Sequence, residues 1–309
     1  MEAAPRALTT LLAGLVDFAG LFPPAGLGME VAAERYARHR AGPHRAALGR
    51  FVVPAARLEE LAQGACAQAA RAGRAPRRPW PVSALVSSPF HADLGRVARF
   101  NDCHADGAGW RGRVEAVEAK VTDIDDARAL AQAAAGLEVF VEVPLQPWPE
   151  DLLEDLEPGT RAKIRTGGIT PEAFPPTGDL AAWIAGCAGC RLPFKATAGL
   201  HHAIRGAHPV TYDAGAPRAV MHGFLNLFVA AALLYWERID VRTAAAVLEE
   251  RDARVFEFAE EYAAWRGRAV TAAELAEART FALGFGSCSF DEPVGDLAAL
   301  GLLSAAPTP

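Results

Sequence analysis

The chain has 309 residues, 51% of them hydrophobic, and a formal net charge of −6, which is typical of an ordinary globular protein. This mild acidity argues against nucleic acid as the main partner, because a phosphate-binding surface needs concentrated positive charge. The 31 basic residues comprise 28 arginines and only three lysines, Lys120, Lys163 and Lys195. Since only an amine can lose its proton near neutral pH and act as a nucleophile, the positions of these lysines matter most.

The N-terminus and the cysteines indicate a cytoplasmic protein. The first residues are acidic and lack the basic and apolar regions of a secretory signal, and five scattered cysteines do not form a disulfide framework. Cys187 and Cys190 have no second ligand pair, so we expect neither a metal nor a cofactor. Residues 219–236 are apolar and long enough to span a bilayer, but His222 and Asn226 favour a buried or dimer-interface helix. We therefore expect no membrane partner and a homo-oligomer.

From residue 14 onward, short β-rich runs alternate with helical runs, which is typical of a parallel α/β fold. Eight such units predict a (β/α)8 TIM barrel forming a single domain over 1–309. Residues 205–280 do not fit one repeat and predict a helical insertion of two or three helices, a lid or a dimer arm, before the last strand. The predicted strands are 14–19, 50–53, 81–86, 113–121, 137–143, 161–166, 192–197 and 281–285. The predicted helices are 29–39, 58–72, 94–101, 125–135, a short one near 150–156, and 171–185.

Each lysine falls at the end of a predicted strand, which is where the active sites of such barrels lie. Strand side chains alternate between the barrel interior and the surrounding helices. Placing Ile164 and Phe194 outward turns Lys163 and Lys195 inward, and the same alternation applies to the other strands. The residues predicted to face the interior are Glu118, Lys120, Glu138, Glu142, Lys163, Arg165, Lys195 and Thr197.

The predicted proximity of Lys163 and Lys195 indicates imine chemistry. Neighbouring strands lie ~4.8 Å apart, so two inward ammonium groups would repel each other, and we expect the pKa of one lysine to fall. A free amine beside a carboxylic acid and a cation is suited to Schiff-base formation with a carbonyl substrate. The alternative is a structural network in which Glu118 and Glu142 neutralise the lysines.

Further polar and glycine residues fall at the same predicted strand ends. The loop at Gly286 and Ser287 could cradle a phosphate together with Gly167 and Gly168, or could be a tight turn that needs glycine. Arg165 suits a carboxylate or phosphate, since its planar fork pairs bidentately with either. His201 could relay protons or bind substrate, or be a solvated loop histidine. The candidate substrate-binding residues are Asp17, Arg165, Gly167, Gly168, Thr197, Gly199, His201, Gly286 and Ser287; Cys288, with no clear base nearby, is expected to be a packing residue.

Residues 163–167 (Lys-Ile-Arg-Thr-Gly) and 194–199 (Phe-Lys-Ala-Thr-Ala-Gly) together resemble the paired-lysine pattern of the deoxyribose-phosphate aldolases. The resemblance extends over about 14–200 and 284–289, and it implies a class I aldolase barrel. By this resemblance, Lys163 would form the Schiff base, Lys195 would lower its pKa and Glu118 would be the acid–base partner. The chain departs from the pattern at Arg165, where the family has a small residue, at Ala198, which breaks a glycine pair, and in carrying Lys120.

Three functions are consistent with these residues. The first is a lysine-dependent carbon–carbon lyase of carbohydrate metabolism that acts on a small carbonyl substrate, with catalytic residues Glu118, Lys120, Glu142, Lys163 and Lys195. The second is an imine-independent decarboxylase or isomerase acting on a sugar-phosphate-like substrate. The third is a non-catalytic barrel that binds a small anion.

Overall fold

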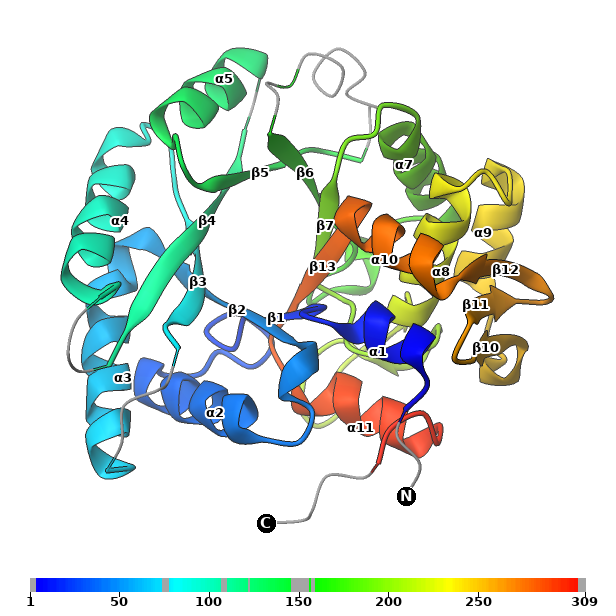
Figure 1. Cartoon of the computed structure of the whole chain (residues 1–309), viewed down its shortest axis with the longest axis horizontal. Helices are drawn as coiled ribbons and strands as arrows, with labels where there is room; N and C mark the ends of the chain where they lie inside the picture. Colours follow the sequence, from blue (N-terminus) through cyan, green and yellow to red (C-terminus); the bar gives the residue numbers. More distant parts are fainter. Residues whose placement is uncertain are drawn as a thin grey trace.

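The computed structural model describes residues 4–73, 78–106, 110–121, 123–145, 156 and 159–304. Its strands form a closed barrel in the order β1-β13-β7-β6-β5-β4-β3-β2, and every neighbouring pair is parallel. Helices surround this ring (Figure 1). The predicted (β/α)8 TIM barrel is confirmed. The barrel strands are β1 (Val16–Phe18), β2 (Leu48–Pro54), β3 (Trp80–Leu85), β4 (Gly112–Lys120), β5 (Glu138–Glu142), β6 (Thr160–Arg165), β7 (Phe194–Thr197) and β13 (Ala282–Ser287).

The helices follow the predicted alternation closely in the first half of the chain. Ala-rich and Leu-rich runs with apolar residues at helical spacing form them, and their buried faces pack on the barrel. The predicted helix near 150–156 lies almost entirely outside the described residues. The described α-helices are α1 (Arg6–Leu12), α2 (Met29–Ala41), α3 (Leu58–Arg71), α4 (His91–His104), α5 (Ile124–Ala133), α7 (Thr177–Gly189), α8 (Phe224–Tyr235), α9 (Val241–Glu249), α10 (Ala272–Phe281) and α11 (Asp291–Ala299).

The main core lies between the strands and the helices, where the outward side chains of the strands pack. Phe194 of β7 meets Trp183 of α7 edge to face at 5.3 Å. Phe285 of β13 stacks on Phe224 of α8 at 5.4 Å. Because successive strand residues point to opposite faces, outward Phe194 fixes its neighbour Lys195 inward, as the alternation predicted.

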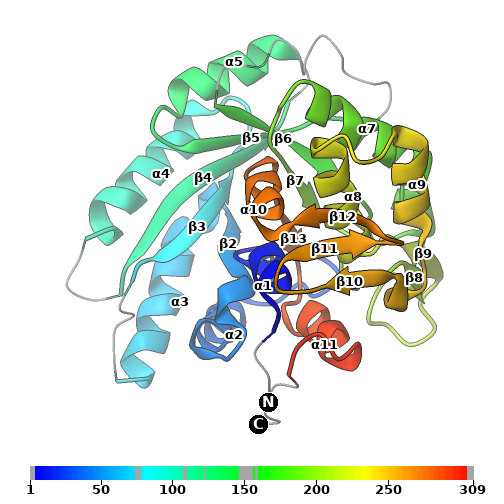
Figure 2. The same cartoon turned by 45° about the vertical axis from the view of Figure 1, so that its right-hand side comes forward.

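The segment 205–280 contains the predicted helices α8, α9 and α10, but it also contains two small antiparallel sheets. One is the hairpin of β8 (Gly206–Pro209) and β9 (Arg218–Met221), and the other joins β10 (Phe256–Phe258), β11 (Tyr262–Trp265) and β12 (Arg268–Thr271). In Figure 2 the second sheet comes forward beside α1. The sequence predicted the helices of this segment but not its two sheets.

The apolar run at 219–236 forms β9 and α8, and α8 is part of the barrel's core. Every residue from Phe224 to Leu234 is buried. The buried alternative is thus correct, and this helix offers no surface for a dimer. Among the described residues, no helix is both long and apolar enough to cross a membrane.

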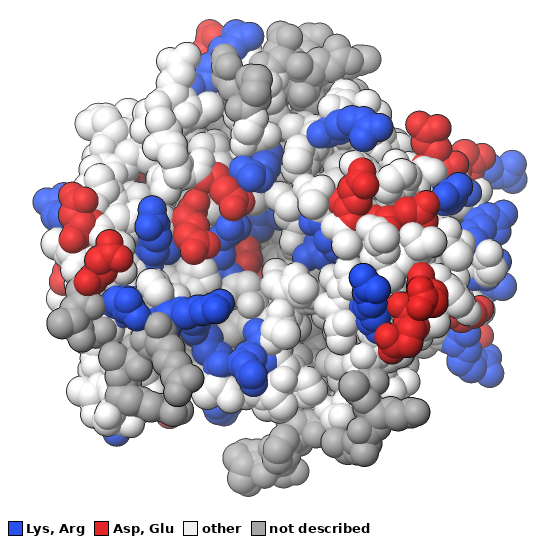
Figure 3. Space-filling view, viewed as in Figure 1, with Lys and Arg blue, Asp and Glu red and all other residues white. Residues whose placement is uncertain are grey.

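The barrel interior also carries a charged layer at the start of the strands. Arg50 of β2 pairs with Glu138 of β5 at 2.8 Å and with Glu115 of β4 at 3.4 Å, and Arg161 of β6 lies 3.6 Å from Glu138. Figure 3 shows acidic and basic side chains gathered at the centre of the face in view. Glu138, predicted to face inward, belongs to this layer at the amino ends of the strands.

Candidate functional site

Four charged residues lie at one level of the barrel, on four adjacent strands. The register pairs Lys120 with Glu142, Glu142 with Lys163, and Lys163 with Lys195, across β4, β5, β6 and β7. This row is near the carboxyl ends of the strands, where barrel active sites lie. The structure brings these four side chains to the lining of one cavity.

A chain of ion pairs runs through this level. The Lys163 ammonium lies 2.9 Å from Glu142 Oε2 and 3.0 Å from Glu118 Oε2. The Lys195 ammonium lies 2.7 Å from Glu118 Oε1 and 2.6 Å from Asp17 Oδ2. Each lysine therefore contacts two carboxylates, and Glu118 joins them, with one oxygen on each.

Glu118 is the most deeply embedded carboxylate of the site. Its side chain is 2% exposed, and Ser83 Oγ of β3 donates a hydrogen bond to Oε1 at 2.6 Å. Burial alone would raise the pKa of Glu118, but the Lys195 and Lys163 ammonium groups and the Ser83 hydroxyl hold it far below its usual range. Glu118 is therefore ionised whenever the lysines are charged.

Two carboxylates set the protonation state of Lys195. Burial alone would lower the pKa of this lysine, but Asp17 and Glu118 raise it above its ordinary value. The expected repulsion between two ammonium groups is offset because a carboxylate lies between them. The pKa of Lys195 therefore does not fall, and Lys195 is a fixed cation.

A cavity of about 450 Å³ opens above this row. The lysines, the carboxylates Glu118 and Glu142, and the predicted residues Arg165, Gly168, Thr197, Gly199, His201 and Gly286 all line it. Asp17 and Ser287, predicted to bind substrate, are buried and are absent from its lining. Asp17 instead holds Lys195 and accepts a hydrogen bond from the Arg50 backbone N–H at 2.6 Å.

Lys120 and Arg165 lie at the cavity's more exposed side. The side chain of Arg165 is 57% exposed and only 3.7 Å from Glu142 at its nearest. Lys120 is exposed and makes no ion pair within the part of the chain that the structure describes. Lys120 thus shares the cavity with the other lysines but not their buried network.

Gly167 is a packing residue rather than part of the cavity lining. A Cβ at Gly167 would lie 2.5 Å from Phe174 and 2.9 Å from the Gly199 Cα, so only glycine lets the loops after β6 and β7 approach this closely. Thr166 Oγ1 fastens the same loops by donating to the Ala198 carbonyl at 2.6 Å. Gly199 lines the cavity and has φ +80, a backbone conformation that favours glycine. The turn alternative for Gly286, Gly167 and Gly168 is not seen, since none of the three has a positive φ.

A second titratable cluster lines the cavity on the side of β7 and β13. His201 Nδ1 lies 3.0 Å from Glu292 Oε2 and 3.9 Å from Cys288 Sγ. The Tyr212 hydroxyl donates to Glu292 at 3.0 Å and lies 3.6 Å from Cys288. Burial alone would lower the pKa of His201, but Cys288 and Glu292 raise it to about 9. Cys288 thus lies next to the His201 imidazole, a neighbour that the sequence did not indicate.

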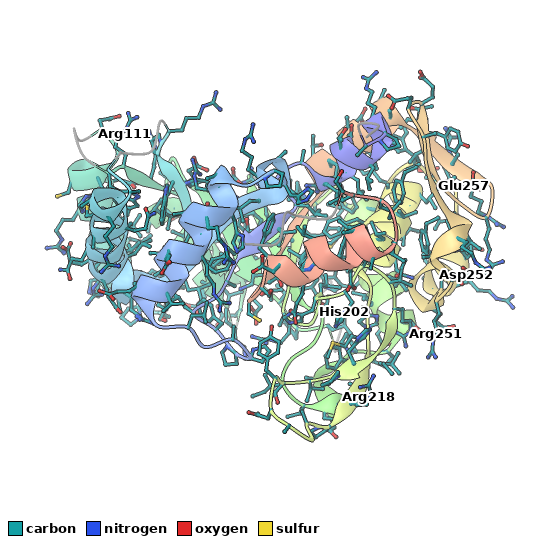
Figure 4. All side chains as sticks on the ribbon, turned by 90° about the horizontal axis from the view of Figure 1, so that it is seen from below. Arg111, His202, Arg218, Arg251, Asp252 and Glu257 are labelled. Atoms are coloured by element: carbon teal, nitrogen blue, oxygen red, sulfur yellow. The ribbon has the colours of Figure 1, made fainter. Side chains whose placement is uncertain are left out.

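Tyr212 reaches this cluster from the β8–β9 hairpin. Figure 4 shows the hairpin, with Arg218 labelled, projecting from the body of the molecule, and His202 nearer the barrel. The His202 ring stacks on His208 of β8 at 3.4 Å, and its Nδ1 lies 3.0 Å from Asp296 of α11. The hairpin is thus fastened to α11 beside the cavity.

Sequence reasoning missed Ser83, Tyr212 and the supporting role of Glu292. Ser83 had a usable signal, because a small hydroxyl residue interrupts a hydrophobic strand at an inward position. Tyr212 had none, since its contact spans 80 residues. Glu292 lies 3.0 Å from His201 Nδ1 and accepts a hydrogen bond from the Tyr212 hydroxyl, contacts that span 91 and 80 residues.

Comparison with known proteins identifies no family for this chain. No protein-family model and no curated protein matches the chain. The chain is similar to the solved structure of a FabK mutant from Thermotoga maritima, at 13% sequence identity and a TM-score of 0.36. The match covers 65% of this chain and 59% of that one, so the chain spans less than two thirds of FabK's length. The class of this protein, a TIM barrel, rests on its own strand topology.

Proposed function

We propose that this protein is a lysine-dependent carbon–carbon lyase, an aldolase, in which Lys163 forms an imine with a small carbonyl substrate. One observation carries the proposal. Lys163 lines a cavity of about 450 Å³ and contacts two carboxylates, one of which also holds a second lysine. This places a nucleophilic amine, proton acceptors and a fixed cation around one small space.

Lys163 suits the nucleophile better than Lys195 does. Lys195 is held between two carboxylates that raise its pKa, so it keeps its proton. Lys163 contacts Glu142, whose side chain is 17% exposed and lines the cavity, so a carbonyl substrate can reach this ion pair. Lys163 and Lys195 share Glu118, with one ammonium group on each of its oxygens.

These groups can supply the proton transfers of imine formation and of carbon–carbon bond cleavage. After the Lys163 ammonium gives one proton to a neighbouring carboxylate, the amine attacks the carbonyl carbon. That proton and one from the nitrogen go to the carbonyl oxygen, which leaves as water, and a protonated imine remains. In the cleavage direction, the electrons of the bond between the α and β carbons flow into that imine and give an enamine, while the hydroxyl on the β carbon becomes the carbonyl of the departing fragment and gives its proton to a base at the cavity. The carboxylates Glu118 and Glu142 favour the positive charge of the imine, since both lie within 3.0 Å of the Lys163 nitrogen.

The cavity suits a small substrate that carries an anionic group. Its volume lies in the lower part of the range for small-molecule sites. Arg165 and Lys120 are the cations at its exposed side, and Arg165 can hold a carboxylate or phosphate through two parallel hydrogen bonds.

A second candidate function keeps the same site without the imine. Both buried lysines are fully ion-paired, which also suits a role as fixed charges that stabilise an enolate in a decarboxylase or isomerase. Lys163→Arg separates the two functions, because arginine keeps the charge and cannot form an imine.

Borohydride trapping tests the proposal. We expect incubation with acetaldehyde or pyruvate, followed by borohydride, to add the mass of one reduced adduct, mapped by peptide mass spectrometry to Lys163. Lys163→Arg should abolish this adduct. Adducts on Lys120 alone, or none with either compound, would refute the imine, and an active Lys163→Arg enzyme would favour the second function.

A further inference from the structure

The cavity has a second set of titratable side chains that the imine step does not use. His201 follows β7, Glu292 lies in the first turn of α11, and Tyr212 lies between β8 and β9. Glu292 is 91 residues from His201 and 80 from Tyr212 in the sequence, yet it lies within hydrogen-bond distance of both. Only His201 and Cys288 of this cluster line the cavity.

Glu292 fixes the orientation of the His201 ring. A carboxylate 3.0 Å from Nδ1 holds the proton on that nitrogen, so Nε2 is the nitrogen left for exchange with a ligand. Nε2 has no hydrogen-bond partner among the described residues. It is also not one of the side-chain atoms that are both fully buried and without a partner. Because His201 lines the cavity, Nε2 has access to that space.

We propose that His201 is the acid–base residue that acts on the oxygen of the acceptor carbonyl, with Glu292 as its positioning residue. The inference rests on the proposed aldolase function and assigns the second half of that reaction. It also divides the cavity by role: the lysine row forms the enamine from the donor, and His201 serves the acceptor.

The proton movements balance. In the bond-forming direction, the enamine carbon attacks the acceptor carbonyl carbon, the π electrons move to oxygen, and Nε2–H supplies the proton that makes it a hydroxyl. In cleavage, neutral Nε2 takes that hydroxyl proton back as the carbon–carbon bond breaks. Cys288 and Glu292 raise the pKa of His201 to about 9, so the ring is protonated near neutral pH and begins as the acid.

The cluster also disfavours a phosphate at this end of the cavity. The loop after the last barrel strand and the following helix N-terminus bind phosphate in many barrels. Here Glu292, in the first turn of α11, is hydrogen-bonded to His201 and Tyr212 at that position. The reacting oxygen of the acceptor would accept a hydrogen bond from the protonated His201, which Glu292 holds in place. Because the Glu292 carboxylate would repel a phosphate at this position, we expect an uncharged acceptor aldehyde.

Two half-reactions test the assignment in the full-length protein. Donor activation is measured by NMR as the exchange of acetaldehyde or pyruvate α-protons in D2O. Bond formation is measured by NMR as the condensation of the same donor with glycolaldehyde. For His201→Gln we expect exchange and borohydride trapping within about threefold of wild type. Condensation should fall by about 10²-fold to 10⁴-fold, the usual contribution of an acid–base residue.

Glu292→Gln tests positioning through the pH profile. Wild-type condensation should decline as the pH rises through about 9, because the acid form of His201 is lost there. Without the carboxylate, that limb should move toward the ordinary pKa of histidine, while exchange changes little. His91→Gln, at an exposed position on α4, is the matched control and should leave both half-reactions unchanged.

The outcomes separate the two proposals. Two results for His201→Gln would overturn the role of His201 and leave the imine intact. One is an equal loss of exchange and condensation; the other is condensation that remains and still declines as the pH rises through about 9. A wild-type protein without exchange or any lysine adduct would overturn the imine, and with it this inference. Thermal melting of each variant checks that a loss is not caused by unfolding.

Discussion

Glu118 determines how two lysines coexist in one barrel interior. Their ammonium groups lie on separate oxygens of this carboxylate. The attraction of each ammonium group to Glu118 therefore offsets the repulsion between the two. Sequence reasoning placed all three residues inside correctly, because strand alternation is reliable. Of its two electrostatic alternatives, repulsion between the ammonium groups or neutralisation by carboxylates, the contacts of Lys195 favour neutralisation, and they add Asp17, which the sequence did not assign to this network.

Replacing Glu118 with glutamine should destabilise the fold in a pH-dependent way. Removing one partner of a buried charge set costs about 3–5 kcal/mol, and here two lysines lose their common partner. Because the pKa of folded Glu118 lies below its ordinary value of 4.5, its stabilising effect is complete above that pH and is lost as the pH falls. Urea unfolding at pH 7 and pH 3.5 should show the wild-type advantage shrinking.

Glu60→Gln is the control for this measurement. Glu60 pairs with Arg57 on the surface, and its side chain is 48% exposed. We expect a change in the free energy of unfolding within about 0.5 kcal/mol at pH 7. An equal loss in both variants, or a Glu118→Gln loss that stays constant with pH, would contradict the account of Glu118.

The strands of the barrel were easier to predict than the segment before the last one. A parallel barrel strand is bounded by long helices, so its period of two is clear in the sequence. The β11–β12 hairpin has only four residues a strand, and its signal is the pair Arg266 and Gly267, both with positive φ. That two-residue turn could have identified the hairpin, whereas nothing local indicates that Tyr212 reaches Glu292.

The contact between the loops after β6 and β7 can be tested with a pair of glycines. Gly167→Ala places a methyl group 2.5 Å from Phe174 and 2.9 Å from backbone, and the resulting overpacking should cost about 1–3 kcal/mol. Gly178→Ala, on α7 with open space around it, should instead stabilise by about 0.5–1 kcal/mol. Thermal unfolding of both variants measures the difference.

Opposite signs for the two glycine variants are the expected result. Since the displaced loops carry Arg165 and Gly199 at the cavity wall, Gly167→Ala should also slow borohydride trapping at Lys163. A Gly167→Ala protein as stable as wild type would show that the loops separate freely and that their close approach is incidental.

At the scale of the whole molecule, the barrel interior contains two charged layers with different roles. The layer of Arg50, Glu115, Glu138 and Arg161 lies at the amino ends of the strands, away from the cavity lining. Residues at that end of a barrel generally serve stability, and those at the carboxyl end serve activity. The sequence identified Glu138 as an inward residue but could not separate the layers, because alternation does not give height along the barrel.

Arg50→Gln should separate stability from activity. The side chain of Arg50 is 21% exposed and holds two carboxylates, so its loss should lower the free energy of unfolding by about 1–3 kcal/mol. Trapping at Lys163 should be unchanged at a temperature well below unfolding, because the backbone N–H that holds Asp17 is retained. A loss of trapping without a loss of stability would contradict the separation into layers.

The alternation of acid and base from Asp17 through Lys195, Glu118 and Lys163 to Glu142 forms an unbroken path across the interior, with no step longer than 3.0 Å. Hydrogen nuclei can move along such a path without passing through solvent. Four of its five side chains, Lys195, Glu118, Lys163 and Glu142, line the cavity, so hydrogen taken from the donor can pass from them to solvent. The isotope content of the product formed in D2O, rather than any rate, would then show how much of the donor's hydrogen has left by this path.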